Sequence, residues 1–266
     1  PNGSLRRFKP LTKKNEVWQM GRPIGCFALK ENGNAIVALS DGFYEFDFAK
    51  NHLTFINNPE ENKPNNRFND GTTDIKGRFF AGTMPISNAS ARDSAQGSLY
   101  CLDLDHSVKF IMDNFFILNG LTFSPDGRTS YISDTVPFIR KIWAFDYDID
   151  NAQWSNKRLF FDTHAVNGRP DGGSMDTDGC YWMAGVGGWE LVRITPNGTV
   201  DMRIKMPIEK PTRIAFGGKN FDVLYVTSIG QNGISPGTFQ KQPNAGGIFS
   251  LRIPGIQGVP TSFFQG

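Results

Sequence analysis

Short runs of apolar residues, bounded by glycine, proline, asparagine or aspartate, follow one another along the 266-residue chain. Representative runs are AIVAL (35–39), GRFFAGTM (77–84), KIWAFDYD (141–148) and VLYVTS (223–228). They are rich in β-branched and aromatic residues, which favour strands. We find no long segment with the 3.6-residue apolar period of a helix. The pattern therefore predicts an all-β protein.

A longer unit repeats within this pattern: a polar residue and a glycine, an apolar run, a glycine turn, and a second run. It reads NDGTTDIKGRFFAGTM at 69–84, NGLTFSPDGRTSYISD at 119–134 and DGGSMDTDGCYWMAG at 171–185, with weaker copies near 25 and 212. Repeats of about 50 residues made of short strands are typical of β-propellers, with about four strands per blade. A blade cannot bury its faces alone, so we expect residues 1–266 to form a single propeller domain.

Polar side chains occupy the same place in each copy of the repeat. The first glycine of each strong copy follows a polar residue. These polar residues are Asp70 (after Asn69), Asn119 and Asp171. If the copies are equivalent blades, these side chains converge near the axis. Such oxygen ligands suit hard or borderline cations. Asn-Gly and Asp-Gly are also common turn dipeptides, so a turn role stays open.

Charge and cysteine content narrow the classes of partner and compartment. The chain has 28 Lys and Arg against 26 Asp and Glu, scattered along the sequence, which favours neither nucleic acid nor a membrane surface. Its three cysteines have no C-x-x-C spacing, which argues against a disulfide framework or a thiolate metal site. We expect a cytoplasmic protein, monomeric or weakly dimeric, with a small-molecule substrate and no nucleic-acid or membrane partner.

Seven stretches of the chain resemble the SMP-30/gluconolactonase/regucalcin family, which includes luciferin-regenerating-enzyme-like proteins. They are NNRFNDG (65–71), GRFFAGTM (77–84), LNGLTFSPDG (118–127), AFDYD (144–148), RPDGGSMDTDG (169–179), FGGKNFDVLYVTS (216–228) and QPNAGGIF (242–249). They occur in the family's order and roughly its spacing. The resemblance implies a six-bladed propeller of four-stranded antiparallel blades. The strand pair expected in residues 1–18 would then belong to a blade whose inner strands are apparently missing from this chain.

The resemblance also implies a divalent cation at the mouth of the central channel and a set of site residues. Asn119 and Asp171 match family metal ligands, and Arg67 and Asn69 match residues that face substrate. The third family ligand, a Glu in a G-E-x-P-x-W segment, has no match, because Glu16 follows the strand pair that should come after that motif. Ca²⁺ is the preferred cation, with Mn²⁺, Mg²⁺ and Zn²⁺ as the alternatives.

These residues suit metal-assisted hydrolysis of a small sugar lactone to the aldonic acid. The sequence predicts that the cation polarises the lactone carbonyl while Asp171 serves as general base and then general acid. Loops 85–97 and 230–246 would shape the pocket. The alternative is a Ca²⁺-binding regulatory propeller without significant catalysis. A protein-interaction propeller and a phosphotriesterase-type side activity are further possibilities.

Overall fold

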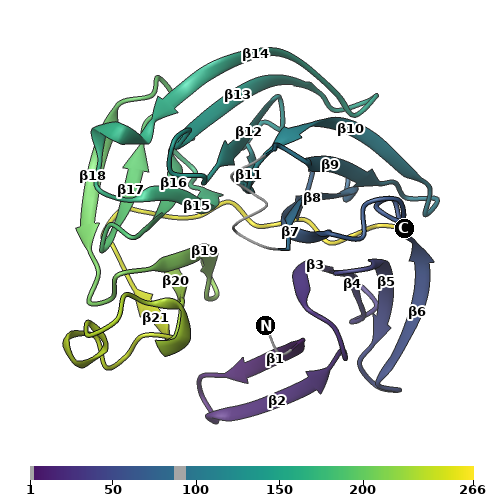
Figure 1. The fold of residues 1–266 in the computed structure, drawn as a ribbon, viewed down its shortest axis with the longest axis horizontal. Helices are drawn as coiled ribbons and strands as arrows, with labels where there is room; N and C mark the ends of the chain where they lie inside the picture. The colour runs from purple at the N-terminus through teal and green to yellow at the C-terminus, as the bar shows by residue number, and fades with distance from the viewer. Residues whose placement is uncertain (1–2, 87–93) are drawn as a thin grey trace. The chain divides into compact units, whose positions relative to one another are not determined.

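The computed structural model describes residues 3–86 and 94–266. All its named strands pair in antiparallel sheets, and the only helices among the described residues are short 3₁₀ turns. The all-β class is therefore confirmed. The chain divides into two compact units, Pro1–Phe116 with Ser262–Gly266, and Ile117–Thr261 (Figure 1). Each unit is described by itself below.

The first unit contains one two-stranded ribbon and two four-stranded sheets, which we call blades. The ribbon is β1 (Ser4–Lys9) and β2 (Lys14–Gln19); the first blade is β3 (Ile24–Leu29), β4 (Ala35–Leu39), β5 (Gly42–Asp47) and β6 (His52–Asn57); the second is β7 (Asn66–Thr73), β8 (Phe79–Pro85), β9 (Gly97–Leu102) and β10 (Val108–Phe115).

Apolar side chains fill the spaces between neighbouring sheets of the first unit. Phe43 of β5 packs against Phe68 of β7 and Phe79 of β8, with ring centroids 4.6 and 6.0 Å apart. Phe264 of the C-terminal segment joins the same cluster and is almost completely buried. The abundant phenylalanines thus hold sheet faces together, because burying such rings supplies much of a core's stability.

The second unit contains two four-stranded blades and one three-stranded blade. They are β11 (Leu118–Phe123), β12 (Thr129–Asp134), β13 (Lys141–Asp148) and β14 (Gln153–Asp162); β15 (Arg169–Met175), β16 (Tyr181–Val186), β17 (Glu190–Ile194) and β18 (Val200–Lys205); and β19 (Pro211–Gly217), β20 (Val223–Ser228) and β21 (Ile248–Leu251). The 3₁₀ helices η2 (Thr163–Ala165), η3 (Gln231–Gly233) and η4 (Phe239–Lys241) lie in its connections.

The blades of the second unit also pack face to face. Tyr131 of β12, Tyr181 of β16 and Phe160 of β14 form one buried aromatic group. Trp182 of β16 packs edge-on against Phe216 of β19 on the other side of the same blade. Strand β16 is therefore packed by aromatic side chains on both of its faces.

The prediction of six four-stranded blades is wrong. The described residues form five blades, four of them with four strands and one with three, besides the β1–β2 ribbon. The last blade lacks a fourth strand because residues 252–261 contain Pro254, Gly255, Gly258 and Pro260, and proline cannot donate to a sheet ladder. That segment makes backbone hydrogen bonds to Met175, Thr177 and Phe221 and an isolated bridge between Gly258 and Asp176, but no named strand, before Ser262–Gly266 join the first unit.

Candidate functional site

The innermost strand of the second blade carries a β-bulge at two of the candidate residues. Phe68 pairs with Thr83 and Gly71 pairs with Ala81, so Asn69 and Asp70 together face one residue of β8. A bulge interrupts strand alternation and changes the direction in which side chains project, and it is common beside active sites.

The same irregularity recurs in both four-stranded blades of the second unit. In β15, Asp171 and Gly172 are the extra pair opposite β16, between the paired residues Pro170 and Gly173. In β11, the pairing shifts directly after Asn119. The Asn-Gly and Asp-Gly steps are therefore bulges within strands, and the open interpretation of them as hairpin turns does not hold.

Glycine follows Asn119 and Asp171 because another strand comes very close at that point. A Cβ atom on Gly120, whose φ is +64°, would lie 2.3 Å from the Tyr181 hydroxyl and 3.1 Å from the carbonyl oxygen of Asp171. One on Gly172 would lie 2.8 Å from the Thr212 carbonyl oxygen. These contacts require a residue without a side chain.

A relay of hydrogen bonds joins Asn119 to the residue before Asp171. The Thr135 hydroxyl donates to the Pro170 carbonyl oxygen at 2.5 Å, and the Asn119 amide nitrogen donates to the same hydroxyl at 2.7 Å. Because a threonine hydroxyl has a single hydrogen, it must accept from Asn119. The relay therefore holds the amide nitrogen of Asn119 at Thr135 and ties its orientation to the strand that carries Asp171.

Arg67 and Asn69 lie together in the first unit. Arg67 donates to the Phe68 carbonyl oxygen at 2.8 Å, to Asn69 Oδ1 at 3.1 Å and to Met84 Sδ at 3.3 Å. Burial lowers the pKa of Arg67, and no carboxylate of the described residues forms an ion pair with it. Arg67 is thus a desolvated cation in contact with Asn69, as a substrate-facing pair would require.

Glu60, which was not singled out from the sequence, anchors the loop before Arg67. Its buried carboxylate accepts hydrogen bonds from Asn66 at 2.8 Å, Thr83 at 3.0 Å and Tyr100 at 2.8 Å. Burial, together with the hydrogen bond to Glu60, raises the pKa of Tyr100 to about 12. A glutamate in a polar loop has no local signal for burial, because two of its three partners, Thr83 and Tyr100, are 23 and 40 residues away in the sequence.

Two charged residues hold the segment before β15 in a similar way. Arg140 donates to four backbone carbonyl oxygens within residues 163–168, at 2.9 to 3.2 Å. Glu190 accepts from the Asn167 and Gly168 amides at 2.8 and 3.0 Å and pairs with Arg203. Together they fix the start of the strand that carries Asp171, and neither was singled out from the sequence.

Other residues weighed from the sequence have structural partners. Asp134 accepts from the amides of Ile117 and Val136, both at 3.1 Å. Glu16 lies in β2, where hydrogen bonds from Arg7 and then Lys14 lower its pKa to about 2. Glu16 therefore belongs to a surface ion cluster on the ribbon, in agreement with its exclusion as a ligand.

The comparisons with known proteins decide the family. The chain matches the SMP-30/Gluconolactonase/LRE-like region over residues 1–230. It is 35% identical to regucalcin of Oryctolagus cuniculus over 268 aligned residues, covering 100% of this chain and 89% of the rabbit protein. The chain belongs to the SMP-30/gluconolactonase/LRE-like family.

Solved structures of family members share the fold. A luciferin-regenerating enzyme superposes with a TM-score of 0.89 at 29% identity, covering 98% of this chain and 87% of the other. Regucalcin from Agrobacterium tumefaciens, described as a calcium-binding protein, gives a TM-score of 0.91 at 25% identity, covering 99% and 86%. The resemblance found in the sequence motifs is therefore confirmed.

The donor atoms near Asn119 are oxygens, which hard cations prefer. They are too few to form a complete metal-binding site by themselves. Asn119 and Asp171 offer an amide oxygen and a carboxylate, and the buried Ser133 hydroxyl, which lies against Gly120, has no hydrogen-bond partner among the described residues. Within residues 3–86 and 94–266, no group of three or more His, Cys, Asp or Glu side chains could hold a metal ion. The two residues that the sequence resemblance assigns as ligands offer only oxygen donors, the kind typical of Ca²⁺ or Mg²⁺ sites.

Loops 85–97 and 230–246 are the two loops that the sequence predicts to shape the pocket. Residues 87–93 of the loop 85–97 lie outside the described residues. Loop 230–246 is anchored by the fully buried Gln242, which accepts from the Glu209 amide at 2.8 Å and donates to Thr238 at 2.9 Å. Burial raises the pKa of Glu209, but hydrogen bonds from Ser235 and Gln242 outweigh it and hold that pKa below its ordinary value.

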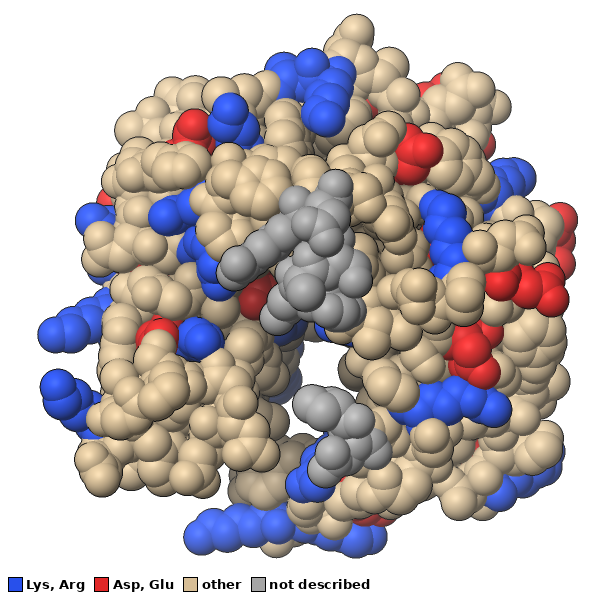
Figure 2. All heavy atoms as spheres, viewed as in Figure 1, with Lys and Arg blue, Asp and Glu red and all other residues tan. Residues whose placement is uncertain are grey.

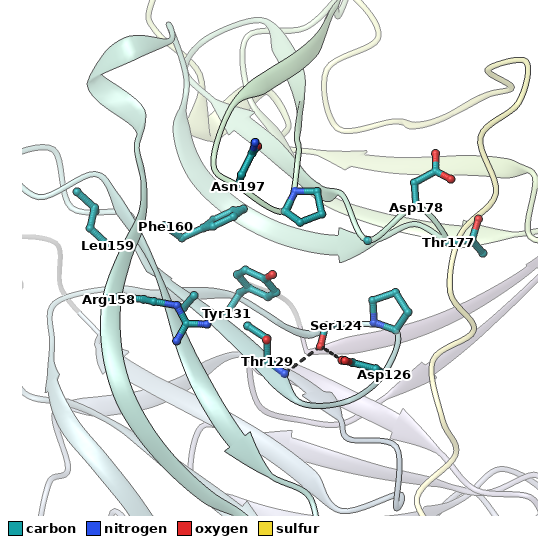
Figure 3. A pocket seen from close by; sticks show the side chains of 14 residues that line it. Ser124, Asp126, Thr129, Tyr131, Arg158, Leu159, Phe160, Thr177, Asp178 and Asn197 are labelled. Carbon is teal, nitrogen blue, oxygen red and sulfur yellow. Dashed lines mark hydrogen bonds between the residues drawn. The ribbon is translucent and has the colours of Figure 1, made fainter.

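A cavity of about 580 Å³ lies in the second unit, away from the family ligand positions. Figure 3 shows it lined by Tyr131, Phe160, Arg158 and Asp178, among others. Its wall includes the turns that follow β11 and β15, whereas Asn119 and Asp171 stand near the starts of those strands. This cavity is therefore separate from the candidate metal position.

Surface charge and hydropathy add two observations. On the face drawn in Figure 2, Lys and Arg are spread out with Asp and Glu between them. Among the described residues, no helix has the length and apolar character needed to cross a bilayer.

Proposed function

We propose that this chain is a metal-dependent hydrolase that opens a small sugar lactone to the aldonic acid. Membership of the gluconolactonase-containing family supports a lactonase. The observation that carries the proposal is the paired placement of Asn119 and Asp171 at the bulged starts of neighbouring inner strands, joined through Thr135.

Asn119 and Asp171 are the residues that would hold a divalent cation, through the amide oxygen and the carboxylate. A cation bound there would supply a Lewis acid for the lactone carbonyl. Thr135 positions Asn119, and Tyr181 donates to the Gly120 carbonyl oxygen at 2.8 Å, which steadies the same bulge. Ca²⁺ is the preferred ion, since one regucalcin relative is described as a calcium-binding protein.

Asp171 is also the proposed general base. Its carboxylate is half-buried and so remains within reach of water. It takes a proton from the attacking water and later returns that proton to the ring oxygen that leaves as an alcohol. Arg67 and Asn69 are proposed to orient the substrate, on the basis of the N-R-x-N-D match and the desolvated Arg67 guanidinium.

The test is the opening of a panel of D- and L-aldonolactones, followed with a pH indicator. Protein stripped with EDTA should lose turnover, and adding back Ca²⁺, Mn²⁺, Mg²⁺ or Zn²⁺ one at a time should restore it. Turnover that is unaffected by EDTA would overturn the metal-dependent mechanism.

The second candidate function is Ca²⁺ binding without significant catalysis. Similarity to regucalcins favours it, because curated regucalcins match along nearly all of the chain. Calorimetric binding of Ca²⁺, with no lactone opened faster than in a protein-free blank, would select this function over the first.

A further inference from the structure

The second unit contains a cavity of about 580 Å³ that the proposed lactonase mechanism does not use. It lies between two neighbouring blades, and its wall is formed by β12 to β14 and by the turns that follow β11, β15 and β17. Volumes of about 300 to 1,000 Å³ are usual for sites that bind small molecules. The side chains of the wall therefore indicate what kind of molecule fits.

A buried tyrosine hydroxyl faces this cavity. Tyr131 is only 5% exposed, and Figure 3 shows its ring pointing into the cavity beside Phe160. Contacts with Phe160 and Tyr181 hold the ring, with centroids 4.8 and 5.5 Å away. Within residues 3–86 and 94–266, the Tyr131 hydroxyl has no hydrogen-bond partner. Burial raises the pKa of Tyr131, so the hydroxyl keeps its proton at neutral pH and can donate as well as accept.

The three charged side chains of the wall are already engaged. Arg158 forms an ion pair with Asp146 at 2.7 Å, and Asp178 forms one with Arg193 at 2.6 Å. Asp126 accepts a hydrogen bond from a hydroxyl of its own turn at 2.6 Å. An ionic ligand would have to displace one of these partners, whereas a neutral ligand leaves all three in place.

Apolar groups form much of the remaining wall. They include the ring of Phe160, which is partly exposed, the 55% exposed Leu159, and the rings of Pro125 and Pro196. An aromatic ring that enters the cavity removes this surface from water and packs against Phe160. A sugar ring suits the wall less well, because its many hydroxyl groups each need a partner and most polar groups of the wall are already engaged.

Hydrogen bonds hold two of the turns that form the wall. The Ser124 hydroxyl accepts from the Thr129 amide at 2.9 Å, which closes the turn between β11 and β12. The Thr177 amide, in the turn after β15, donates to the Gln257 carbonyl oxygen at 2.8 Å. The cavity is therefore formed before a ligand arrives, which lowers the entropic cost of binding.

We propose that this cavity is a second ligand site, which binds a small neutral aromatic molecule with one hydroxyl group, and that Tyr131 forms a hydrogen bond with that hydroxyl. The ligand hydroxyl replaces solvent water as the partner of Tyr131, and the ligand ring covers Phe160. The site is independent of the proposed lactonase function, because Asn119 and Asp171 stand near the other ends of β11 and β15.

Titrations with p-cresol and toluene, followed by ligand-observed NMR, test the hydrogen bond. The two probes share a ring and a methyl group, and only p-cresol has the hydroxyl. We expect Tyr131→Phe to raise the Kd of p-cresol about 3- to 10-fold, the size of one lost neutral hydrogen bond, and to leave the Kd of toluene within about twofold. No binding of p-cresol to the wild-type protein, or an unchanged Kd in Tyr131→Phe, would overturn the inference.

Two control variants locate the binding site. Tyr225→Phe removes the same hydroxyl from a tyrosine of β20 that does not line the cavity, and should leave the Kd of p-cresol within about twofold of wild type. Asp171→Ala should also leave it within about twofold, whether or not lactone turnover is lost. A loss of p-cresol binding in Asp171→Ala would place the ligand at the proposed catalytic site and refute the second site.

Two further probes test the class of ligand. In 4-methylbenzoate a carboxylate replaces the hydroxyl of p-cresol, and D-glucose has hydroxyl groups without an aromatic ring. Each should bind at least about threefold more weakly than p-cresol, because the charges of the wall are paired and few of its polar groups are available. Tighter binding of either probe than of p-cresol would contradict a neutral aromatic ligand.

The stability of Tyr131→Phe tests the premise that the hydroxyl has no partner in the folded protein. Removing such a hydroxyl costs no hydrogen bond, so the midpoint of urea unfolding should stay the same or rise. A lower midpoint in Tyr131→Phe than in Tyr225→Phe would show that the fold itself uses the Tyr131 hydroxyl, and would overturn the inference.

Discussion

At the scale of single residues, the candidate site depends on side chains that hold other side chains in place. Thr135 holds the amide nitrogen of Asn119, and so restricts how the proposed ligand can be oriented. Asn119 and Asp171 could be picked from the sequence because they stand beside glycines in a repeat. Thr135 could not, because its hydrogen bond to Pro170 spans 35 residues and has no local pattern.

Replacing Thr135 with valine removes the hydroxyl but keeps the shape. The Asn119 amide then loses its fixed orientation, and we expect Ca²⁺ affinity to fall by about 10-fold, as for other residues that orient metal ligands. Isothermal titration calorimetry measures the change. Thr129→Val, at the opposite end of β12, is the matched control. Equal affinities in the two variants would exclude a positioning role for Thr135.

Two neighbouring buried groups make the stability of the protein sensitive to alkali. Burial raises the pKa of Cys101 from 9.0 to about 12, and burial with the Glu60 hydrogen bond raises that of Tyr100 from 10.0 to about 12. At a pH between the ordinary pKa values of 9.0 and 10.0 and the raised values of about 12, the folded state retains protons that the unfolded state has lost. The free energy of unfolding should therefore be unaffected below pH 9 and decrease as the pH approaches 12.

Urea unfolding at several alkaline pH values measures this decrease. Tyr100→Phe removes one of the two titrating groups, so its stability should fall less steeply with pH than that of the wild type. A free energy of unfolding that stays constant between pH 9 and 12 would contradict the burial of these groups.

At the scale of elements, turns were predictable from the sequence and bulges were not. The S-P-D-G segment at 124–127 connects β11 to β12, and T-P-N-G at 195–198 connects β17 to β18, as their turn chemistry predicts. The bulges at Asn69 and Asp171 depend on how two strands align. The register of the two strands is set by packing between blades. The strand propensity of single residues does not determine it.

Gly120→Ala tests the close approach at the β11 bulge. The new methyl group would collide with the Tyr181 hydroxyl, so we expect a loss of about 3 kcal/mol in the free energy of unfolding. Gly33→Ala is the control, since Gly33 also has positive φ but open space around it, and it should cost only about 1 kcal/mol. Chemical denaturation of both variants gives the comparison. Similar losses of unfolding free energy in the two variants would mean that the positive φ alone, without the contact with Tyr181, explains the glycine at position 120.

At the scale of the whole molecule, the five copies of the repeat correspond to the five blades, whereas the wrong expectation of a sixth blade came from the family resemblance. Four repeats gave complete four-stranded blades, because each contains two hairpins with strong strand and turn signals. The last repeat gave three strands, because the prolines and glycines of residues 252–261 cannot continue a ladder. Buried charges such as Glu60 and Glu190 escaped prediction for a related reason: their partners are brought together only by the fold.

The most direct test of the central claim is kcat/KM for lactone opening, with Ca²⁺ present, in the wild type, Asp171→Ala and Asp178→Ala. Asp178 is an exposed carboxylate in the turn after β15, paired with Arg193, and serves as the matched control. Our account predicts that Asp171→Ala lowers kcat/KM at least about 100-fold, while Asp178→Ala stays within about threefold of wild type. Turnover that persists in Asp171→Ala would show that this carboxylate neither binds the cation nor moves the proton, and would contradict the account.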